Sequence, residues 1–120
     1  MTTQKQALGQ WGEETAVRFL ESHGYAILAR NLHTAHGEID IVAGKEAALI
    51  FVEVKTRSSH AFAYPEASVT LRKQAALLSA AEEYLQAHPE STESWQFDVI
   101  AIERKPGGKP EIVHFENVIS

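Results

Sequence analysis

The sequence contains no cysteine, which excludes disulfide bonds, thiolate zinc sites and cysteine nucleophiles. It also lacks a long apolar run: the longest, AALIFV, is far shorter than the roughly 20 residues of a membrane-spanning helix. The N-terminal MTTQKQALGQ has no apolar stretch of the kind found in secretion signals. No Walker loop, GxGxxG or GxSxG motif occurs, so nucleotide-cofactor chemistry and serine acyl transfer lack support. We therefore expect a cytoplasmic protein with no membrane partner.

Acidic residues outnumber basic ones, and a net charge of −5 argues against nucleic-acid binding through whole-domain basicity. The charges are unevenly distributed along the chain. Residues 55–73 carry a single acid, Glu66, whereas residues 82–93 hold a cluster of acids. The basic side chains of that first segment are Lys55, Arg57, Arg72 and Lys73. One segment of an acidic chain is thus suited to contacts with phosphate.

Length and periodicity predict one domain of residues 1–120. The chain of 120 residues has the usual size of a single domain, and no repeat or linker interrupts it. Apolar residues at helical spacing predict helices at 4–23 and 68–88, ended by Gly24 and Pro89. Strands are predicted at 25–31, 37–43, 47–55, 95–102 and 111–115, and a loop at 56–66. This order predicts an α/β fold with a mixed central β-sheet flanked by helices.

The predicted hairpin GEIDIVAGKEAALIFVEVKTR, residues 37–57, carries acids and a lysine in an otherwise apolar run. Because side chains alternate across a strand, Glu53 and Lys55 share one face of theirs. Glu38 and Asp40 likewise share a face of the neighbouring strand. We interpret Glu38, at the start of its strand, as a solvated rim residue and leave it out of the catalytic set.

The register of this hairpin decides whether the acids meet. If Gly44 pairs with Ala47 across a two-residue turn, Asp40 lies opposite Phe51 and diagonal to Glu53. A slip by one residue would place the two acids on opposite faces of the sheet. The prediction of a site therefore depends on the register.

Two carboxylates a few ångströms apart repel each other unless a cation lies between them, and a hard divalent cation is the usual one. Asp40 and Glu53 are therefore predicted metal ligands. Lys55, one pleat further along, would place an ammonium beside the metal, where it can stabilise developing charge or orient an attacking water. This combination suits phosphodiester hydrolysis. The alternative is a salt-bridge cluster on an exposed sheet face.

Each predicted helix turns one polar side chain toward its buried side. Glu13 borders the apolar arc of the first helix, whereas Glu14 lies well outside it. Gly9 and Gly12 beside Glu13 would allow a backbone or a substrate to approach closely. Gln74 lies within the leucine stripe of the second helix. The alternatives are a helix-edge charge for Glu13 and a bond from Gln74 to a loop backbone.

The layout of these motifs resembles a known group of nucleases. A helical Glu13 is followed by GEID at 37–40, FVEVKTR at 51–57 and RKQ at 72–74. This arrangement resembles the PD-(D/E)xK nuclease superfamily. In detail it is similar to the YraN-type family of predicted bacterial endonucleases, relatives of archaeal Holliday junction resolvases. Ile39 stands where the name of the motif has proline.

The resemblance implies a restriction-endonuclease-like (PD-(D/E)xK) fold and a metal-dependent endonuclease acting on DNA. Asp40, Glu53 and the carbonyl of Val54 would bind Mg²⁺ (or Mn²⁺). Lys55 would be the catalytic lysine and Glu13 an auxiliary acid. Branched DNA, as for a Holliday junction resolvase, and a homodimer follow by analogy alone. Contacts to DNA are expected from the loop and the second helix, at Arg57, Arg72, Lys73 and Gln74.

Other polar residues and other functions stay open at this point. The three-residue spacing of His33 and His36 suggests zinc, but no further close ligand pair supports it. Asp98 on a buried strand is expected to pair with a basic or histidine side chain in a structural role. The rival functions are a nucleic-acid-binding module that keeps the fold without efficient cleavage, and a protein-interaction scaffold that binds no DNA.

Overall fold

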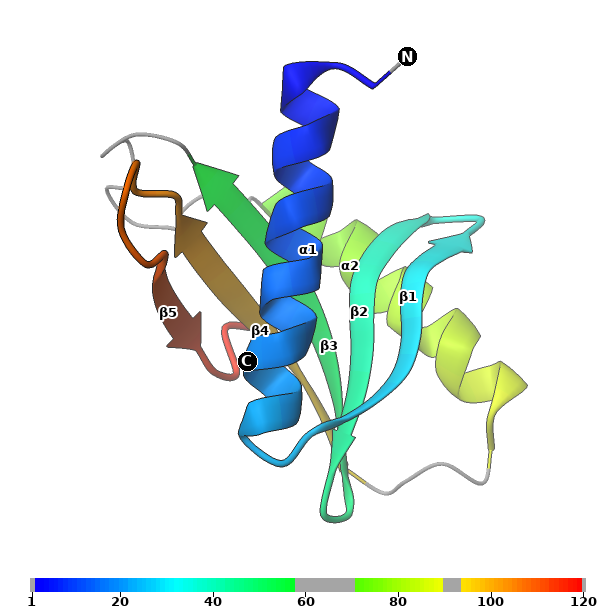
Figure 1. Ribbon diagram of the computed structural model, residues 1–120. Helices are drawn as coiled ribbons and strands as arrows, with labels where there is room; N and C mark the ends of the chain where they lie inside the picture. Colours follow the sequence, from blue (N-terminus) through cyan, green and yellow to red (C-terminus); the bar gives the residue numbers. More distant parts are fainter. Residues whose placement is uncertain (1, 58–70, 90–93, 120) are drawn as a thin grey trace.

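The computed structural model describes residues 2–57, 71–89 and 94–119 (Figure 1). The described residues form two helices and five strands in the predicted order. No helix in these three ranges is long and apolar enough to cross a membrane. The elements are α1 (Gln4–Ser22), β1 (Ala26–Thr34), β2 (Gly37–Lys45), β3 (Ala48–Arg57), α2 (Leu71–Ala87), β4 (Ser94–Glu103) and β5 (Glu111–Phe115).

Helix α1 begins and ends where local side-chain chemistry predicts. Thr3 forms a capping box: its hydroxyl accepts the N–H of Gln6 at 3.0 Å, and the Gln6 amide oxygen accepts the N–H of Thr3 at 2.9 Å. At the other end Gly24 adopts a φ of 88°, a left-handed conformation that favours glycine. The predicted stop at Gly24 is confirmed.

The sheet is mixed, and its strands follow the sequence order β1-β2-β3-β4-β5. Strands β1, β2 and β3 form an antiparallel meander, β3 and β4 are parallel, and β4 and β5 are antiparallel. Helix α2 connects the parallel pair. Figure 1 shows α1 on one face of the sheet and α2 on the other, here named the α1 face and the α2 face. The predicted α/β architecture with a mixed sheet and flanking helices is confirmed.

Each helix covers its own apolar cluster on the sheet. On the α1 face, Ala16 and Leu20 are fully buried against side chains that include Ile41, Val52 and Ile100. On the α2 face, helix residues including Leu77 and Tyr84 pack over a cluster centred on Phe51. Even positions of β3 therefore belong to the α1 face and odd positions to the α2 face.

The register predicted for the β2–β3 hairpin is wrong by two residues. Gly44 pairs with Leu49 instead of Ala47, and Phe51 pairs with Val42 instead of Asp40. The turn consists of Glu46 and Ala47, with Glu46 at a left-handed φ of 57°. Because side chains repeat every second residue along a strand, a slip of two keeps every face unchanged, so the apolar pattern does not detect it.

The predicted loop at 56–66 and the predicted start of the second helix at 68 lie wholly or partly outside the described residues. Residues 56 and 57 of the predicted loop belong to β3, and the rest of that loop lies outside the described residues. The predicted start of the second helix at 68 also lies outside them, and α2 is described from Leu71 onward. Its end at Ala87 agrees with the predicted stop before Pro89.

Candidate functional site

The candidate site lies where β2 and β3 separate. Their pairing runs from the turn to Ile41 opposite Val52 and goes no further, although both strands continue. Figure 1 shows the two strands diverging beyond this point. Ile39 packs in the α2-face cluster and Ile41 in the α1-face cluster, so the regular alternation of β2 is broken at Asp40. Asp40 occupies the position from which the strands separate.

The carboxylate of Asp40 replaces the missing backbone pairing. Its Oδ2 accepts the N–H of Val54 on β3 at 2.8 Å. In a strand, the N–H and C=O of one residue point to the same side, so the carbonyl of Val54 also faces Asp40. The structure thus brings together two of the oxygen donors that the sequence predicts as metal ligands.

Glu53 and Lys55 share the α2 face, as predicted from strand alternation. Nζ of Lys55 lies 3.4 Å from Oε1 of Glu53, and both side chains are largely buried. Lys73, from the first turn of α2, forms an ion pair with the same oxygen. Glu53, Lys55 and Lys73 are called the acid-lysine cluster below. Lys73, predicted as a DNA contact, is therefore placed against a predicted metal ligand.

Both lysines contact Oε1 of Glu53, and its second carboxylate oxygen, Oε2, has different surroundings. Oε2 is buried and, among the described residues, lacks a hydrogen-bond partner. A buried carboxylate oxygen without a partner is unfavourable by about 1 to 3 kcal/mol or more. Bound metal ions supply the positive partner that such an oxygen needs, so the donor set of Glu53, Asp40 and the Val54 carbonyl fits a hard divalent cation.

Glu13 approaches the site from α1. It is half-buried and Glu14 is exposed, as the helical wheel predicts. Glu14 forms a salt bridge with Arg30 at 2.9 Å. Gly12 allows this approach: a Cβ at Gly12 would lie 3.0 Å from the Cβ of Thr56 on β3 and closer still to its Oγ1. Only glycine lets α1 pack this tightly against the end of β3.

Burial and neighbouring charges change the pKa values of Asp40 and Glu13. Burial raises the pKa of Asp40 to about 6, and the charges of Glu13 and Glu53 add to the rise. The N–H of Val54 opposes it by stabilising the carboxylate. Burial also raises the pKa of Glu13. The carboxylate of Asp40, on β2, is therefore close enough to feel the charges of Glu53 on β3 and Glu13 on α1.

The pKa values of Lys55 and Lys73 are shifted in opposite directions. Burial and the hydrogen bond with Lys73 lower the pKa of Lys55. Burial also acts against the charge of Lys73, but hydrogen bonds to Glu53 and Lys55 outweigh it and raise its pKa. Lys73 thus keeps its charge most firmly, and Lys55 releases a proton more readily than a free lysine does.

The other predicted DNA contacts lie around this cluster. Arg57 ends β3 and Arg72 lies in the first turn of α2, and both are exposed. Gln74, also in the first turn of α2, is half-buried. The structure therefore places these side chains near the end of β3 that carries Lys55.

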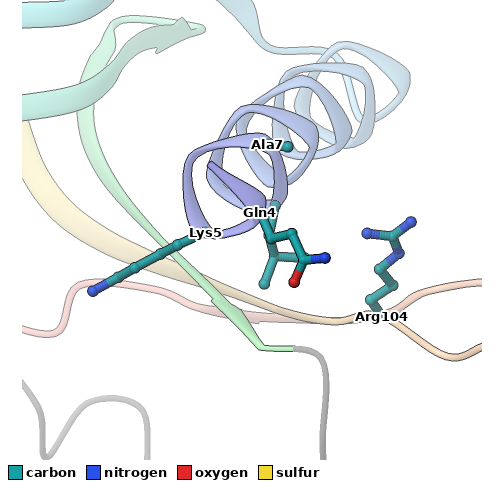
Figure 2. A pocket seen from close by; sticks show the side chains of 5 residues that line it. Gln4, Lys5, Ala7 and Arg104 are labelled. Carbon is teal, nitrogen blue, oxygen red and sulfur yellow. The ribbon is translucent and has the colours of Figure 1, made fainter. Parts of the chain in front are cut away.

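Two cavities border the N-terminal half of α1. One, of about 400 Å³, is lined by Glu13 together with Thr2, Gln6, Gly9 and Gln10. The other, of about 500 Å³, lies between α1 and Arg104 and holds none of the predicted site residues. Figure 2 shows Lys5 and Arg104 reaching to opposite sides of Gln4, so their charges do not converge there. Of the predicted site residues, only Glu13 lines the first cavity, and none lines the second.

A second group of side chains that could hold a metal ion includes Asp98, and the sequence analysis identified it only in part. Asp98 pairs with a histidine as expected: its Oδ2 lies 2.7 Å from Nε2 of His114. Glu116 joins them, and one ligand atom from each of the three lies within 4.8 Å of the others. We call these three residues the Asp98 triad. Pairing the predicted strands 95–102 and 111–115 could have identified His114 as the partner of Asp98. Nothing in the sequence indicated that Glu116 joins them.

Sequence comparison places the chain in a family. The model of a family described as "Uncharacterised protein family UPF0102" matches residues 12–102, a range that includes Glu13, Asp40, Glu53 and Lys55. The chain belongs to the UPF0102 family. This membership confirms the predicted YraN-type relationship.

Individual UPF0102 proteins match over nearly their whole length. One from Syntrophomonas wolfei is 46% identical over 110 residues, which cover 92% of this chain and 95% of the relative. Another, from Syntrophotalea carbinolica, is 44% identical over 115 residues, covering 96% and 93%. Among solved structures, Pyrococcus furiosus SfsA in complex with Ca²⁺ matches 93% of this chain and 63% of that chain, with 13% identity and a TM-score of 0.38.

Proposed function

We propose that this UPF0102 protein is a metal-dependent endonuclease with a restriction-endonuclease-like fold that hydrolyses phosphodiester bonds in DNA. The observation that carries the proposal is the buried Oε2 of Glu53, which among the described residues has no hydrogen-bond partner. It lies in a group of carboxylates that includes Asp40, whose pKa is raised to about 6. Such a group is stabilised by a divalent cation.

Asp40, Glu53 and the Val54 carbonyl would hold the Mg²⁺ or Mn²⁺. When bound, the ion would polarise the scissile phosphate and neutralise developing negative charge. Asp40 is already oriented by the N–H of Val54 at 2.8 Å, so its carboxylate needs no rearrangement to present an oxygen. Glu13 would contribute a further acid from α1.

Lys55 would act on the attacking water and on the phosphate. Its amino group is fixed 3.4 Å from Glu53, and burial lowers its pKa. A lysine with a lowered pKa exchanges protons more readily at neutral pH, so Lys55 can orient the nucleophile or stabilise the charge that develops on phosphate oxygens. Arg57 and Arg72, both exposed near the end of β3, would contact neighbouring phosphates.

One observation favours the second candidate, a nucleic-acid-binding module without efficient cleavage. Lys73 forms an ion pair with Glu53, the same carboxylate that would bind the metal. If Lys73 stays there when DNA binds, metal binding is weakened and the fold serves only to bind DNA.

Cleavage assays separate the two candidates. The full chain is incubated with Mg²⁺ or Mn²⁺ and linear, flap, single-stranded or four-way junction DNA, the last because of the resemblance to resolvases. We expect Lys55→Ala to lose about 100-fold or more of the cleavage rate. Lys109→Ala, an exposed lysine in the turn before β5, serves as the matched control with full activity.

Metal titration tests the ligand set directly. In calorimetry with Mg²⁺, Asp40→Asn and Glu53→Gln should each bind more weakly than the wild type, because each removes one anionic ligand. Equal affinities in all three proteins would contradict the assignment. DNA binding without cleavage by the wild type in either metal would establish the binding module instead.

A further inference from the structure

The Asp98 triad lies on the α1 face of the sheet, which is the opposite face from the acid-lysine cluster. Asp98 is on β4, His114 is on β5, and Glu116 follows β5 directly. The pairing of β4 with β5 ends with Val99 opposite Phe115, so continuing that register by one residue brings Glu116 opposite Asp98. Backbone geometry therefore gathers the triad at the end of the sheet where the chain approaches its C-terminal segment.

Asp98 is held as the carboxylates of metal sites are held. Its side chain is 0% exposed, a buried charge that requires compensation. Oδ1 accepts the side-chain N–H of Gln96 and the backbone N–H of Asn117, both at 2.9 Å. Oδ2 lies 2.7 Å from Nε2 of His114. One oxygen is thus fixed by two donors, and the other is directed at an imidazole nitrogen.

The segment after β5 is shaped around this carboxylate. Asn117 adopts a left-handed φ of 53°, which turns the chain so that its N–H reaches Asp98. The next N–H, from Val118, bonds the carbonyl of Phe97 at 2.8 Å. The same turn brings the carboxylate of Glu116 to the triad.

We propose that the Asp98 triad binds a late first-row transition-metal ion, Zn²⁺ by preference. One imidazole nitrogen and two carboxylate oxygens form a mixed donor set that suits zinc, whereas Mg²⁺ and Ca²⁺ are bound almost wholly by oxygen. Two carboxylates and a neutral imidazole also balance one divalent charge. The ion would tie β5 and the segment after it to the buried strand β4.

A fourth ligand can reach this site as water. Glu116 also lines a cavity of about 270 Å³, together with Tyr25, Lys45, Glu46 and Gln96. Water in this cavity is available to complete a tetrahedral site that has three protein ligands.

The aromatic surroundings of His114 fix the direction of its ring. The ring of Phe19, on α1, packs edge-on at a centroid distance of 5.9 Å, and that of Tyr25 lies at 6.1 Å. Figure 1 shows the C-terminal end of the chain beside the C-terminal half of α1, in agreement with these contacts. The imidazole is therefore oriented before an ion binds, which favours tight coordination.

The test uses the full chain after removal of metals with a chelator. Co²⁺ alone is titrated while its visible absorption bands are followed, and Zn²⁺ alone is titrated by calorimetry. We expect one equivalent to bind tightly to the wild type. His114→Gln and Glu116→Gln should each weaken binding by about 10-fold or more. Glu116 is exposed, so its variant should fold normally, and circular dichroism checks the folding of both.

Two controls separate this site from others on the chain. His33→Gln removes an exposed histidine far from the triad and should leave Zn²⁺ affinity unchanged. The double variant Asp40→Asn, Glu53→Gln should also keep it, so failure of the proposed nuclease site would not affect this result. The inference is overturned if the wild type binds no Zn²⁺ at micromolar concentrations, or if His114→Gln and Glu116→Gln bind as tightly as the wild type.

Discussion

Replacing Asp40 by asparagine should stabilise the protein at neutral pH, in buffer without divalent cations, and leave its stability nearly unchanged in acid. Burial, with smaller contributions from Glu13 and Glu53, raises the pKa of Asp40 from 3.8 to about 6. The folded chain then binds a proton more tightly than the unfolded chain, so the free energy of unfolding falls as pH rises through this range. At about 1.4 kcal/mol for each tenfold change in proton affinity, the loss is about 3 kcal/mol.

The assay is urea unfolding of wild type and Asp40→Asn at a series of pH values, with a chelator present. An asparagine oxygen can still accept the N–H of Val54, so the variant removes the charge and keeps the hydrogen bond. The two proteins should be about equally stable near pH 4, and the variant should be more stable by about 3 kcal/mol near pH 7.5. This difference would move the urea midpoint by about 1 to 3 M. A stability difference that does not change with pH would refute the reasoning.

Three further predictions test packing and DNA binding. Gly12→Ala should lower the melting temperature, because the new Cβ would collide with Thr56. Gly9→Ala is the control: its Cβ would have no atom within 4 Å, so it should add up to about 1 kcal/mol of stability. Equal losses of stability in both variants would contradict the close contact of α1 with β3. Phe51→Ala, at the fully buried centre of the α2-face cluster, should cost about 3 to 5 kcal/mol in urea unfolding, and a cost near zero would contradict that packing. Arg72→Ala should reduce the slope of log affinity against log salt by about 0.9 on duplex DNA, and an unchanged slope would place the DNA elsewhere.

The helices and strands of this fold are predictable because their signals are local and repeat over many residues. The capping box at Thr3 and the left-handed Gly24 delimit α1 within one residue of the prediction. The apolar pattern assigns the correct faces to Glu53 and Lys55 but leaves the register of the hairpin open to a slip of two. Choosing between registers required the φ of Glu46, which sequence does not reveal.

The break in β2 at Asp40 is not visible in the sequence. A hydrogen bond from the Val54 backbone to the Asp40 side chain replaces the next step of the ladder, and this exchange depends on where the two strands separate. The contact of Lys73 with Glu53 was missed for a related reason. Counting charges along the chain shows a basic segment, but only the packing of α2 against the sheet shows which acid that segment meets.

Lys73 was predicted to contact DNA, and in the structure it forms an ion pair with Glu53. The two roles are compatible if the proposed function holds. Glu53 and Asp40 carry two negative charges, and Lys55 and Lys73 supply two positive ones within the same half-buried region. A divalent cation held by both acids would add two positive charges next to these lysines, an unfavourable state in a region of low dielectric. A phosphate of the proposed DNA substrate would supply the negative charge that removes this excess. Lys73 would then exchange the carboxylate of Glu53 for the phosphate, so metal and DNA would each bind more tightly in the presence of the other.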